Sequence, residues 1–245
     1  MGDWKMSEKV TNRPMWYNAN DVQAAKALSR ELFDFYLLRC PYAKSDQSAA
    51  SSALSLNLSD NGWKKEKLHQ LMQWVGSHFV DERGSLLLSF KVSDSVNDTI
   101  RDYGLDVDNP STAPNRCVLQ IKNKINVFES GECTVRLSEA YATCLFRHIR
   151  NSLAHGNYRI TNQGHVLLLD TSSKMNTANA SKKYTCGLLC EVSFLETLKQ
   201  LVENRPEDMT LSEAQKSQVG KGYRVKLDKQ VVLEPKSDDQ ETQTD

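Results

Sequence analysis

Hydrophobic residues recur at every third or fourth position in several stretches of the chain, and this spacing predicts amphipathic helices. The stretch that organises the others runs from Leu137 to Ile160. Its apolar face contains Ala142, Leu145, Ile149 and Leu153, and the opposite face is polar. Ser138 and Glu139 are typical of a helix start, and Gly156 is typical of a helix end. We therefore expect a helix that begins near Ser138 and stops at Gly156.

Further stretches show the same helical spacing. They cover residues 21–39, 63–79, 93–103 and 190–202. The first should end before Pro41, because a proline disfavours helical geometry in the residue that precedes it. Residues 45–62 fit either a loop or a short helix over 47–58. Helices should therefore dominate the fold.

Signals for β-structure are fewer. Residues 158–160 and 165–169 flank the turn-forming run Thr-Asn-Gln-Gly and predict a β-hairpin near 158–169. Residues 86–90 and 117–128 fit either strand or helix. Residues 223–233 alternate between polar and apolar positions, as an edge strand does.

Polar segments without a period predict the loops and the ends of the domain. Two prolines and several turn formers make 106–115 a loop, and 171–183 is a polar stretch that we expect to be a loop as well. At 245 residues the chain can bury one sizeable core. We expect a partly ordered arm at 1–19, a single domain at 20–233 and a disordered acidic tail at 234–245.

Composition is that of an ordinary globular protein, with 31 basic and 31 acidic residues. The six cysteines form no C-x-x-C pair and no zinc-type spacing with histidine, so reduced and mostly buried thiols are expected. No long apolar run or signal peptide is present in the sequence, which favours a cytoplasmic protein without a membrane span. Neither a metal site nor a cofactor is expected.

Charge is distributed unevenly around the central helix. Between Glu139 and Asp170 the sequence has no acidic residue. The same window holds Arg147, His148, Arg150, His155, Arg159 and His165. A local positive field of this kind would attract a polyanion such as RNA. The alternative is a solvated basic helix face with no ligand.

The run Arg150-Asn151-Ser152-Leu153-Ala154-His155 resembles the signature of the HEPN superfamily (higher eukaryotes and prokaryotes nucleotide-binding), an Arg followed by a polar residue and then a His near a helix end. Members are α-helical bundles, so the resemblance implies a mainly α (α+β) fold, a HEPN-like bundle of four to five helices with the hairpin as a small appendage. Many members are metal-independent endoribonucleases that act as homodimers, with two Arg-and-His motifs facing one cleft.

The resemblance implies a role for each matching residue. His155 would act as the general acid or base, Arg150 would stabilise the phosphate, and Asn151 would orient His155 one turn away. Arg147, His148 and Arg159 would contact the substrate. Tyr158 is a further candidate for substrate contact. One branch of the family carries a Tyr two residues after the His that is a target for modification. Here Tyr158 lies three residues after His155, so the spacing departs from that pattern. A histidine before a helix-ending glycine can also simply cap the helix.

Three functions remain open at this point. The first is an endoribonuclease toxin or antiviral-defence effector, with RNA as substrate and an antitoxin or other regulatory protein as a partner. The second is a non-catalytic HEPN module that binds RNA or nucleotides, or that serves as a dimerising scaffold. The third is a helical interaction protein whose motif is accidental.

Overall fold

The structure is a computed structural model of the chain. It describes residues 14–41, 56, 58, 60–92, 95–105, 115–127, 133–137, 139–172 and 182–204. Several predicted features lie outside these residues. They are most of the N-terminal arm, the segment 45–55, nearly all of the loops at 106–115 and 171–183, the edge strand at 223–233 and the acidic tail at 234–245.

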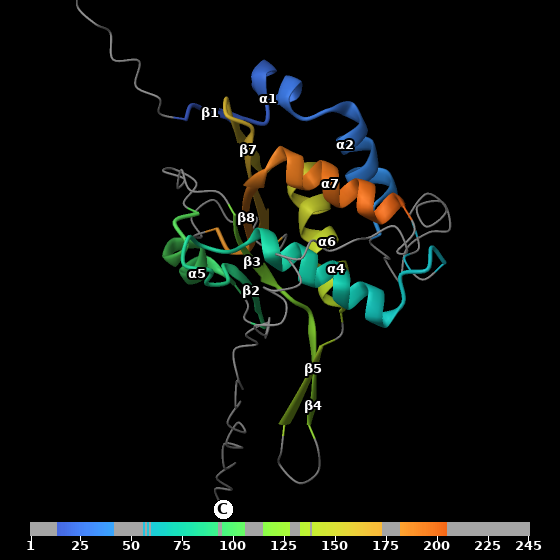
Figure 1. Ribbon diagram of the computed structural model, residues 1–245. Coiled ribbons are helices and arrows are strands. Elements are labelled where there is room, and N and C mark those ends of the chain that lie inside the picture. Colours follow the sequence, from blue (N-terminus) through green and yellow to red (C-terminus); the bar gives the residue numbers. More distant parts are fainter. Residues whose placement is uncertain are drawn as a thin grey trace, which may run out of the picture.

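A six-stranded mixed sheet forms the centre of the fold (Figure 1). Its strands, in spatial order, are β1 (Trp16–Asn18), β6 (Tyr158–Thr161), β7 (His165–Thr171), β8 (Tyr184–Glu191), β3 (Arg116–Gln120) and β2 (Leu88–Lys91). The β2 and β3 strands pair in parallel, and every other neighbouring pair is antiparallel. The predicted hairpin is therefore confirmed as β6 and β7, but it lies within this sheet.

The predicted helical bundle with a small appendage is wrong: this is an α+β fold with a substantial sheet. Strands β7 and β8 are covered on both faces, and their buried residues form continuous apolar runs such as Val166–Leu169. Such runs lack the polar alternation that marks a half-buried strand, so periodicity cannot distinguish them from buried helix. The ambiguous segments at 86–90 and 117–128 are resolved as strands, and β8 was not predicted at all.

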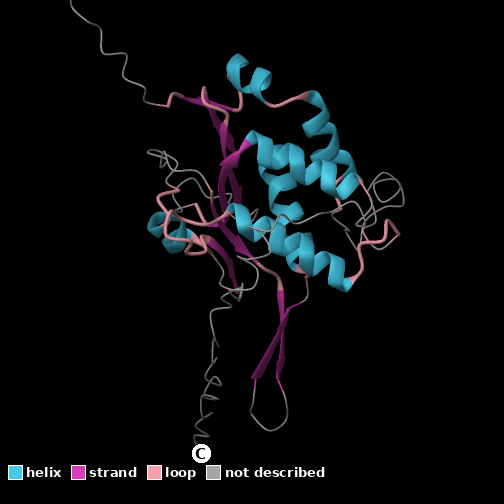
Figure 2. Cartoon of the chain, in the orientation of Figure 1, coloured by secondary structure: helices cyan, strands magenta, loops and turns pink. Residues whose placement is uncertain are grey.

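Helices cover both faces of the sheet, as Figure 2 shows. They are α1 (Val22–Ala27), α2 (Arg30–Asp34), the π-helical turn η1 (Phe35–Arg39), α4 (Lys65–His78), α5 (Asn97–Asp102), α6 (Tyr141–Ala154) and α7 (Val192–Glu203). The predicted helices at 63–79 and 93–103 are confirmed with shorter bounds. The one predicted at 190–202 is confirmed as α7, but its first two residues belong to β8 and it ends one residue later. The one at 21–39 is interrupted at Leu28, after which Ser29 caps α2 by accepting from the Leu32 amide at 3.2 Å.

Successive residues of the central strands enter two separate cores. Cys117 and Leu119 of β3 pack with the large core beneath α4, α6 and α7, whereas Val118 between them joins a small core with α5. Gly187 of β8 allows α5 to approach closely, because a Cβ atom there would lie 2.9 Å from Ile100 Cγ1. The sheet is thus the middle layer, with α5 on one face and the larger helical layer on the other (Figure 1).

A second, two-stranded sheet extends away from this body (Figure 1). It consists of β4 (Asn123–Val127) and β5 (Cys133–Leu137), which pair antiparallel and lead directly into the start of α6. Strand β3 precedes it by two residues, Ile121 and Lys122. These two strands therefore connect β3, next to the edge strand β2, to the helix that carries the motif.

Two predictions from composition can be compared with the described residues. Cys40, Cys117, Cys144, Cys186 and Cys190 are free and buried, as expected. Burial raises the pKa of the thiols of Cys117, Cys186 and Cys190 well above the usual value. Within the ranges given above, none of the helices has the length and apolar character that crossing a bilayer requires.

Candidate functional site

Helix α6 carries the motif and packs on the face of the sheet that the larger helical layer covers. All four residues of its predicted apolar face are buried in the large core: Ala142, Leu145, Ile149 and Leu153. The helix ends as predicted, because Gly156 has a φ of 64° and its N–H donates to the Leu153 carbonyl at 3.2 Å. The predicted start is wrong, since the N-cap is Ala140, whose side chain offers no acceptor.

Arg147 lies in a buried ion pair instead of facing a substrate. Its Nε donates to Glu139 Oε1 at 2.7 Å and its Nη2 to Glu139 Oε2 at 2.8 Å, so the guanidinium binds the carboxylate with two parallel hydrogen bonds. The same Nη2 lies 2.9 Å from the Gln120 carbonyl, to which it also donates. Only 7% of the Arg147 side chain and 5% of the Glu139 side chain are exposed.

The pKa values of this pair show which effect dominates. Burial by itself raises the pKa of Glu139, but the hydrogen bonds and the charge of Arg147 outweigh burial, and the pKa lies below its usual value. Burial likewise lowers the pKa of Arg147, and the hydrogen bond and charge of Glu139 reverse that effect and raise it. Both groups are therefore ionised at neutral pH, and Arg147 serves the fold.

His148 is also buried, and both of its ring nitrogens face acceptors. Nδ1 lies 2.8 Å from Asp170 Oδ2, and Nε2 lies 2.8 Å from the Gln120 carbonyl oxygen. A carbonyl can only accept, so Nε2 carries a proton, and one more proton must lie between Nδ1 and the Asp170 carboxyl. The His148 side chain has no exposed surface, and a substrate cannot reach it.

Asn151 and Arg150 form the next layer outward along α6. Asn151 Nδ2 donates to Asp170 Oδ2 at 3.2 Å, so one buried carboxylate holds both His148 and Asn151. Arg150 Nη1 lies 3.5 Å from Asn151 Oδ1, at the limit of a hydrogen bond. Both Arg150 and Asn151 are half-buried. The orientation of Asn151 is thus fixed from inside the protein, while part of its surface remains accessible.

His155 is the exposed member of the motif. It is the C-cap of α6, and its backbone N–H donates to the Asn151 carbonyl at 3.0 Å. Tyr158 is buried against Phe33, with ring centroids 6.0 Å apart, and burial raises its pKa. Arg159 is half-buried on β6. Of the predicted site residues, the structure groups Arg150, Asn151 and His155 near the end of α6 and buries Arg147, His148 and Tyr158 in the interior.

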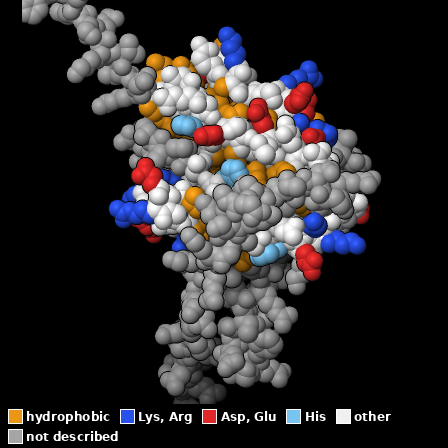
Figure 3. Space-filling view, viewed as in Figure 1, with side chains coloured by type: hydrophobic (Ala, Val, Ile, Leu, Met, Phe, Trp, Pro, Cys, Tyr) orange, Lys and Arg blue, Asp and Glu red, His pale blue; other side chains and the backbone are white. Residues whose placement is uncertain are grey.

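The positive field predicted from the acid-free window is reduced by folding. Glu139 and Asp170 mark the two ends of the acid-free window in the sequence. In the fold, Glu139 pairs with Arg147 and Asp170 contacts His148. Figure 3 shows acidic and basic side chains interspersed over the face in view, with hydrophobic side chains between them. Folding therefore pairs Arg147, one of the two arginines of α6, with an acid.

Two residues of this network were missed from the sequence. Asp170 and Gln120 each occupy the far end of an apolar strand run, on β7 and β3. A carboxylate at the end of a buried strand requires a hydrogen-bond or charge partner. This requirement could have predicted from the sequence that Asp170 contacts one of the buried basic residues. Gln120 contributes its backbone carbonyl, so its residue type gave no signal. Among the residues that the structure describes, no three potential ligands gather where they could hold a metal ion.

Comparisons with models of protein families, with curated proteins and with solved structures found no match for this chain. The resemblance to the HEPN signature consequently depends on residues 150–155 alone. The arrangement supports a phosphate contact through Arg150, a fixed amide at Asn151 and proton transfer through His155.

Proposed function

We propose that the chain is a metal-independent endoribonuclease that acts as a homodimer, with the C-terminal end of α6 as its site. The observation that carries this proposal is the graded burial along one helix. Asn151 is held by a buried carboxylate, Arg150 lies beside it, and His155 is exposed one turn further on. Groups fixed in advance from inside the protein are what transition-state stabilisation requires.

The proposed reaction uses the RNA's own 2′-hydroxyl as nucleophile. A base removes the 2′-hydroxyl proton, the 2′-oxygen attacks the adjacent phosphorus, and an acid protonates the departing 5′-oxygen. The products are a 2′,3′-cyclic phosphate and a free 5′-hydroxyl. Histidine suits both proton transfers because it ordinarily titrates near neutral pH, and the planar guanidinium of Arg150 suits the phosphorane oxygens.

The homodimer follows from the number of groups needed. Base and acid act on opposite sides of the phosphorus, and of the two histidines at α6 only His155 is exposed, since His148 is buried. A two-fold contact between copies would place two His155 and two Arg150 side chains around one substrate. This proposal rests on the motif and its surroundings, because the sheet-centred fold differs from the helical bundle of the family it resembles.

A second candidate function is RNA or nucleotide binding without cleavage, with the chain as a dimerising module. The observation that favours it is the burial of Arg147 and His148, which removes two of the polar groups that the motif helix could have offered for chemistry. A single exposed histidine and a half-buried arginine are sufficient for phosphate binding.

The decisive experiment incubates RNA with the full chain in EDTA, beside Arg150→Ala and His155→Ala variants whose circular dichroism and dimerisation match the unmodified protein. Each substitution should lower the cleavage rate by about a hundredfold or more. Mixing the two inactive variants should not restore activity, because each mixed dimer retains only one His155, whereas the proposed reaction uses one histidine as base and a second as acid.

Arg101→Ala is the matched control, since Arg101 is an exposed arginine on α5, on the other face of the sheet. It should leave cleavage unchanged. Binding without cleavage would reject the ribonuclease in favour of the second candidate. Neither binding nor cleavage would reject both.

A further inference from the structure

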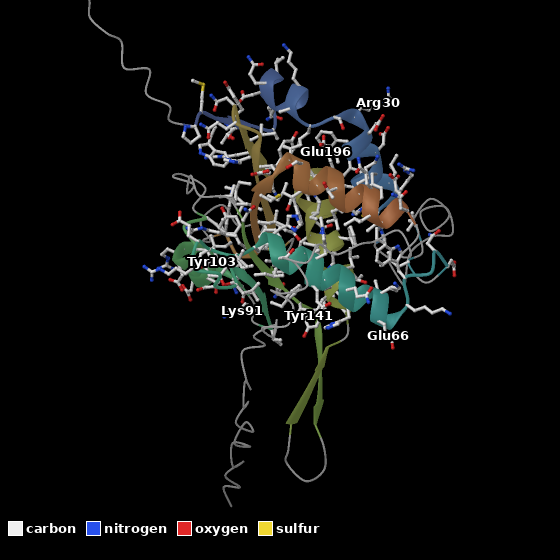
Figure 4. The ribbon with its side chains drawn as sticks, in the orientation of Figure 1. Arg30, Glu66, Lys91, Tyr103, Tyr141 and Glu196 are labelled. Atoms are coloured by element: carbon white, nitrogen blue, oxygen red, sulfur yellow. The ribbon has the colours of Figure 1, made fainter. Side chains whose placement is uncertain are left out.

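The two-stranded sheet of β4 and β5, which we call the ribbon, projects from the body at the start of α6 (Figure 1). The candidate ribonuclease site lies at the other end of this helix, where His155 is the C-cap. Helix α6 has 14 residues, so its two ends are about 21 Å apart. In Figure 4 the labelled Lys91 and Tyr141 lie where the ribbon leaves the body, and Arg30 lies at the opposite end of the molecule.

Hydrogen bonds hold the root of the ribbon to the body. The Ile121 N–H donates to the Lys91 carbonyl at 2.8 Å, and the Lys122 N–H donates to Glu139 Oε2 at 3.2 Å. Glu139 is itself bound by Arg147, so the ion pair that anchors α6 also anchors the ribbon. The root of the ribbon therefore has a fixed place beside the start of the motif helix.

The register of the ribbon places two basic residues directly opposite each other. Lys124 of β4 pairs with Arg136 of β5. Like charges at opposite positions destabilise a strand pair, and neither strand contains an acidic residue that would compensate them. Lys122, which is exposed, lies two positions before Lys124. Three basic residues are thus close together at the root of the ribbon.

The other face of the ribbon is mostly apolar, which raises the alternative that a second copy of the chain covers it. Residues alternate between the two faces of a strand, and this face has apolar residues at the positions of Ile125, Val127, Cys133, Val135 and Leu137. Two strands of five residues measure about 16 Å by about 10 Å, or roughly 160 Å². A stable dimer buries about 800 Å² per partner, so this face by itself is too small to hold a second copy.

A polyanion fits the ribbon better, because its affinity depends on charge and not on contact area. Each phosphate that a basic side chain neutralises releases counterions, and a few such contacts are sufficient for binding. The acidic residue at the root, Glu139, opposes an anion only weakly, since it is paired with Arg147 and its side chain is 5% exposed. Strand pairs are also among the elements by which proteins bind nucleic acids.

We propose that the ribbon binds the phosphate backbone of RNA, with Lys122, Lys124 and Arg136 as the basic residues that hold it. RNA that reaches both the ribbon and His155 has to span the length of α6, so the ribbon favours long substrates. This inference rests on the proposed function for its choice of RNA as the polyanion. Its test uses an RNA that cannot be cleaved, and binding is therefore measured separately from catalysis.

The probe is a fluorescein-labelled single-stranded RNA with methylated 2′-hydroxyls, which lacks the nucleophile of the proposed reaction. Its binding to the full chain is measured by fluorescence anisotropy at several salt concentrations. Lys124→Gln/Arg136→Gln should weaken binding by about tenfold near physiological salt, and it should reduce the slope of log affinity against log salt by about 1.4, because each neutralised phosphate contributes about 0.7. Unchanged affinity and slope would overturn the proposal.

Lys26→Gln/Arg30→Gln is the matched control. It removes the same total charge from exposed residues of α1 and α2, at the end of the molecule opposite to the ribbon (Figure 1). The slope should remain that of the unmodified chain. An equal loss in the two double variants would show that only net charge matters, and it would contradict a site on the ribbon.

Lys124→Glu separates a binding defect from a folding defect. It places opposite charges across the strand pair, so the melting temperature should stay the same or rise, while the affinity for RNA should fall further than in Lys124→Gln. A melting temperature that falls together with the affinity would assign the loss to unfolding of the ribbon and overturn the proposal.

The outcomes also distinguish the two proposals. If the ribbon binds the methylated RNA but the chain cleaves no ordinary RNA, the ribonuclease proposal fails and this inference stands. If the chain cleaves RNA and the ribbon variants bind it as tightly as the unmodified chain does, this inference fails alone. Tighter binding of polyglutamate than of the RNA would assign the ribbon to an acidic protein and reject RNA as its partner.

Discussion

Replacing Arg147 by Met should destabilise the protein strongly, although Arg147 belongs to the segment that sequence reasoning assigned to RNA. The substitution keeps the apolar stem and removes three short hydrogen bonds, two to Glu139 and one to the Gln120 carbonyl. It leaves a carboxylate whose side chain is only 5% exposed, without its charge partner. Breaking one side of a buried pair costs about 3–5 kcal/mol, a large share of a typical stability of about 5–15 kcal/mol.

Urea denaturation followed by circular dichroism measures this cost. The double variant Arg147→Met/Glu139→Leu should recover much of the loss, because it no longer buries an unpaired charge, although the Lys122 amide loses its contact with Glu139 Oε2. Arg101→Met is the matched control. Arg101 and Asp98 are also 2.7 Å apart but are mostly exposed, so the change should be within about 0.5 kcal/mol.

Additive losses of unfolding free energy in the double variant would refute this reasoning. If the losses from Arg147→Met and Glu139→Leu simply sum in the double variant to within about 0.5 kcal/mol, the two side chains do not interact in solution. A loss no larger than that of Arg101→Met would equally show that Arg147 is solvated, and the substrate-contact role predicted from the sequence would be open again.

Three further perturbations follow from the same structure. In the folded protein the pKa of Glu139 lies below its ordinary 4.5, so the ionised pair stabilises the fold above that pH, and this stabilisation is lost as the pH falls through the folded-state pKa. Glu139→Gln should therefore reduce the dependence of the unfolding free energy on pH in acid. An unchanged pH dependence in urea titrations from about pH 6 to 3 would contradict this. Gly187→Val should cost about 1–3 kcal/mol because its side chain would collide with Ile100, and a melting temperature within about 1 °C of the unmodified chain would show that α5 yields freely. Ser29→Ala should cost about 1 kcal/mol by removing the cap of α2, whereas Ser193→Ala, which removes no such cap, should cost less in the same melting experiment.

Sequence reasoning located the motif helix but misjudged its surroundings. The stripe from Ala142 to Leu153 and the stop at Gly156 were predicted correctly, because both depend on the backbone geometry of neighbouring residues. The role of Arg147 depends on Glu139, eight residues away, and on a strand carbonyl. Helical spacing places Arg147 on the polar face but contains no information about what packs against that face.

The division between local and tertiary information also explains the fold. Helical periodicity and the hairpin turn at 161–164 are properties of short segments, and the sequence alone determined them. The sheet depended on pairing β8 with β7 and with β3, which is far from β8 in the chain. These strands are buried on both faces, so no alternation marked them. Only tertiary packing placed Asp170 against His148 and Asn151, because the free energy of burying a charge depends on which partners the fold brings to it.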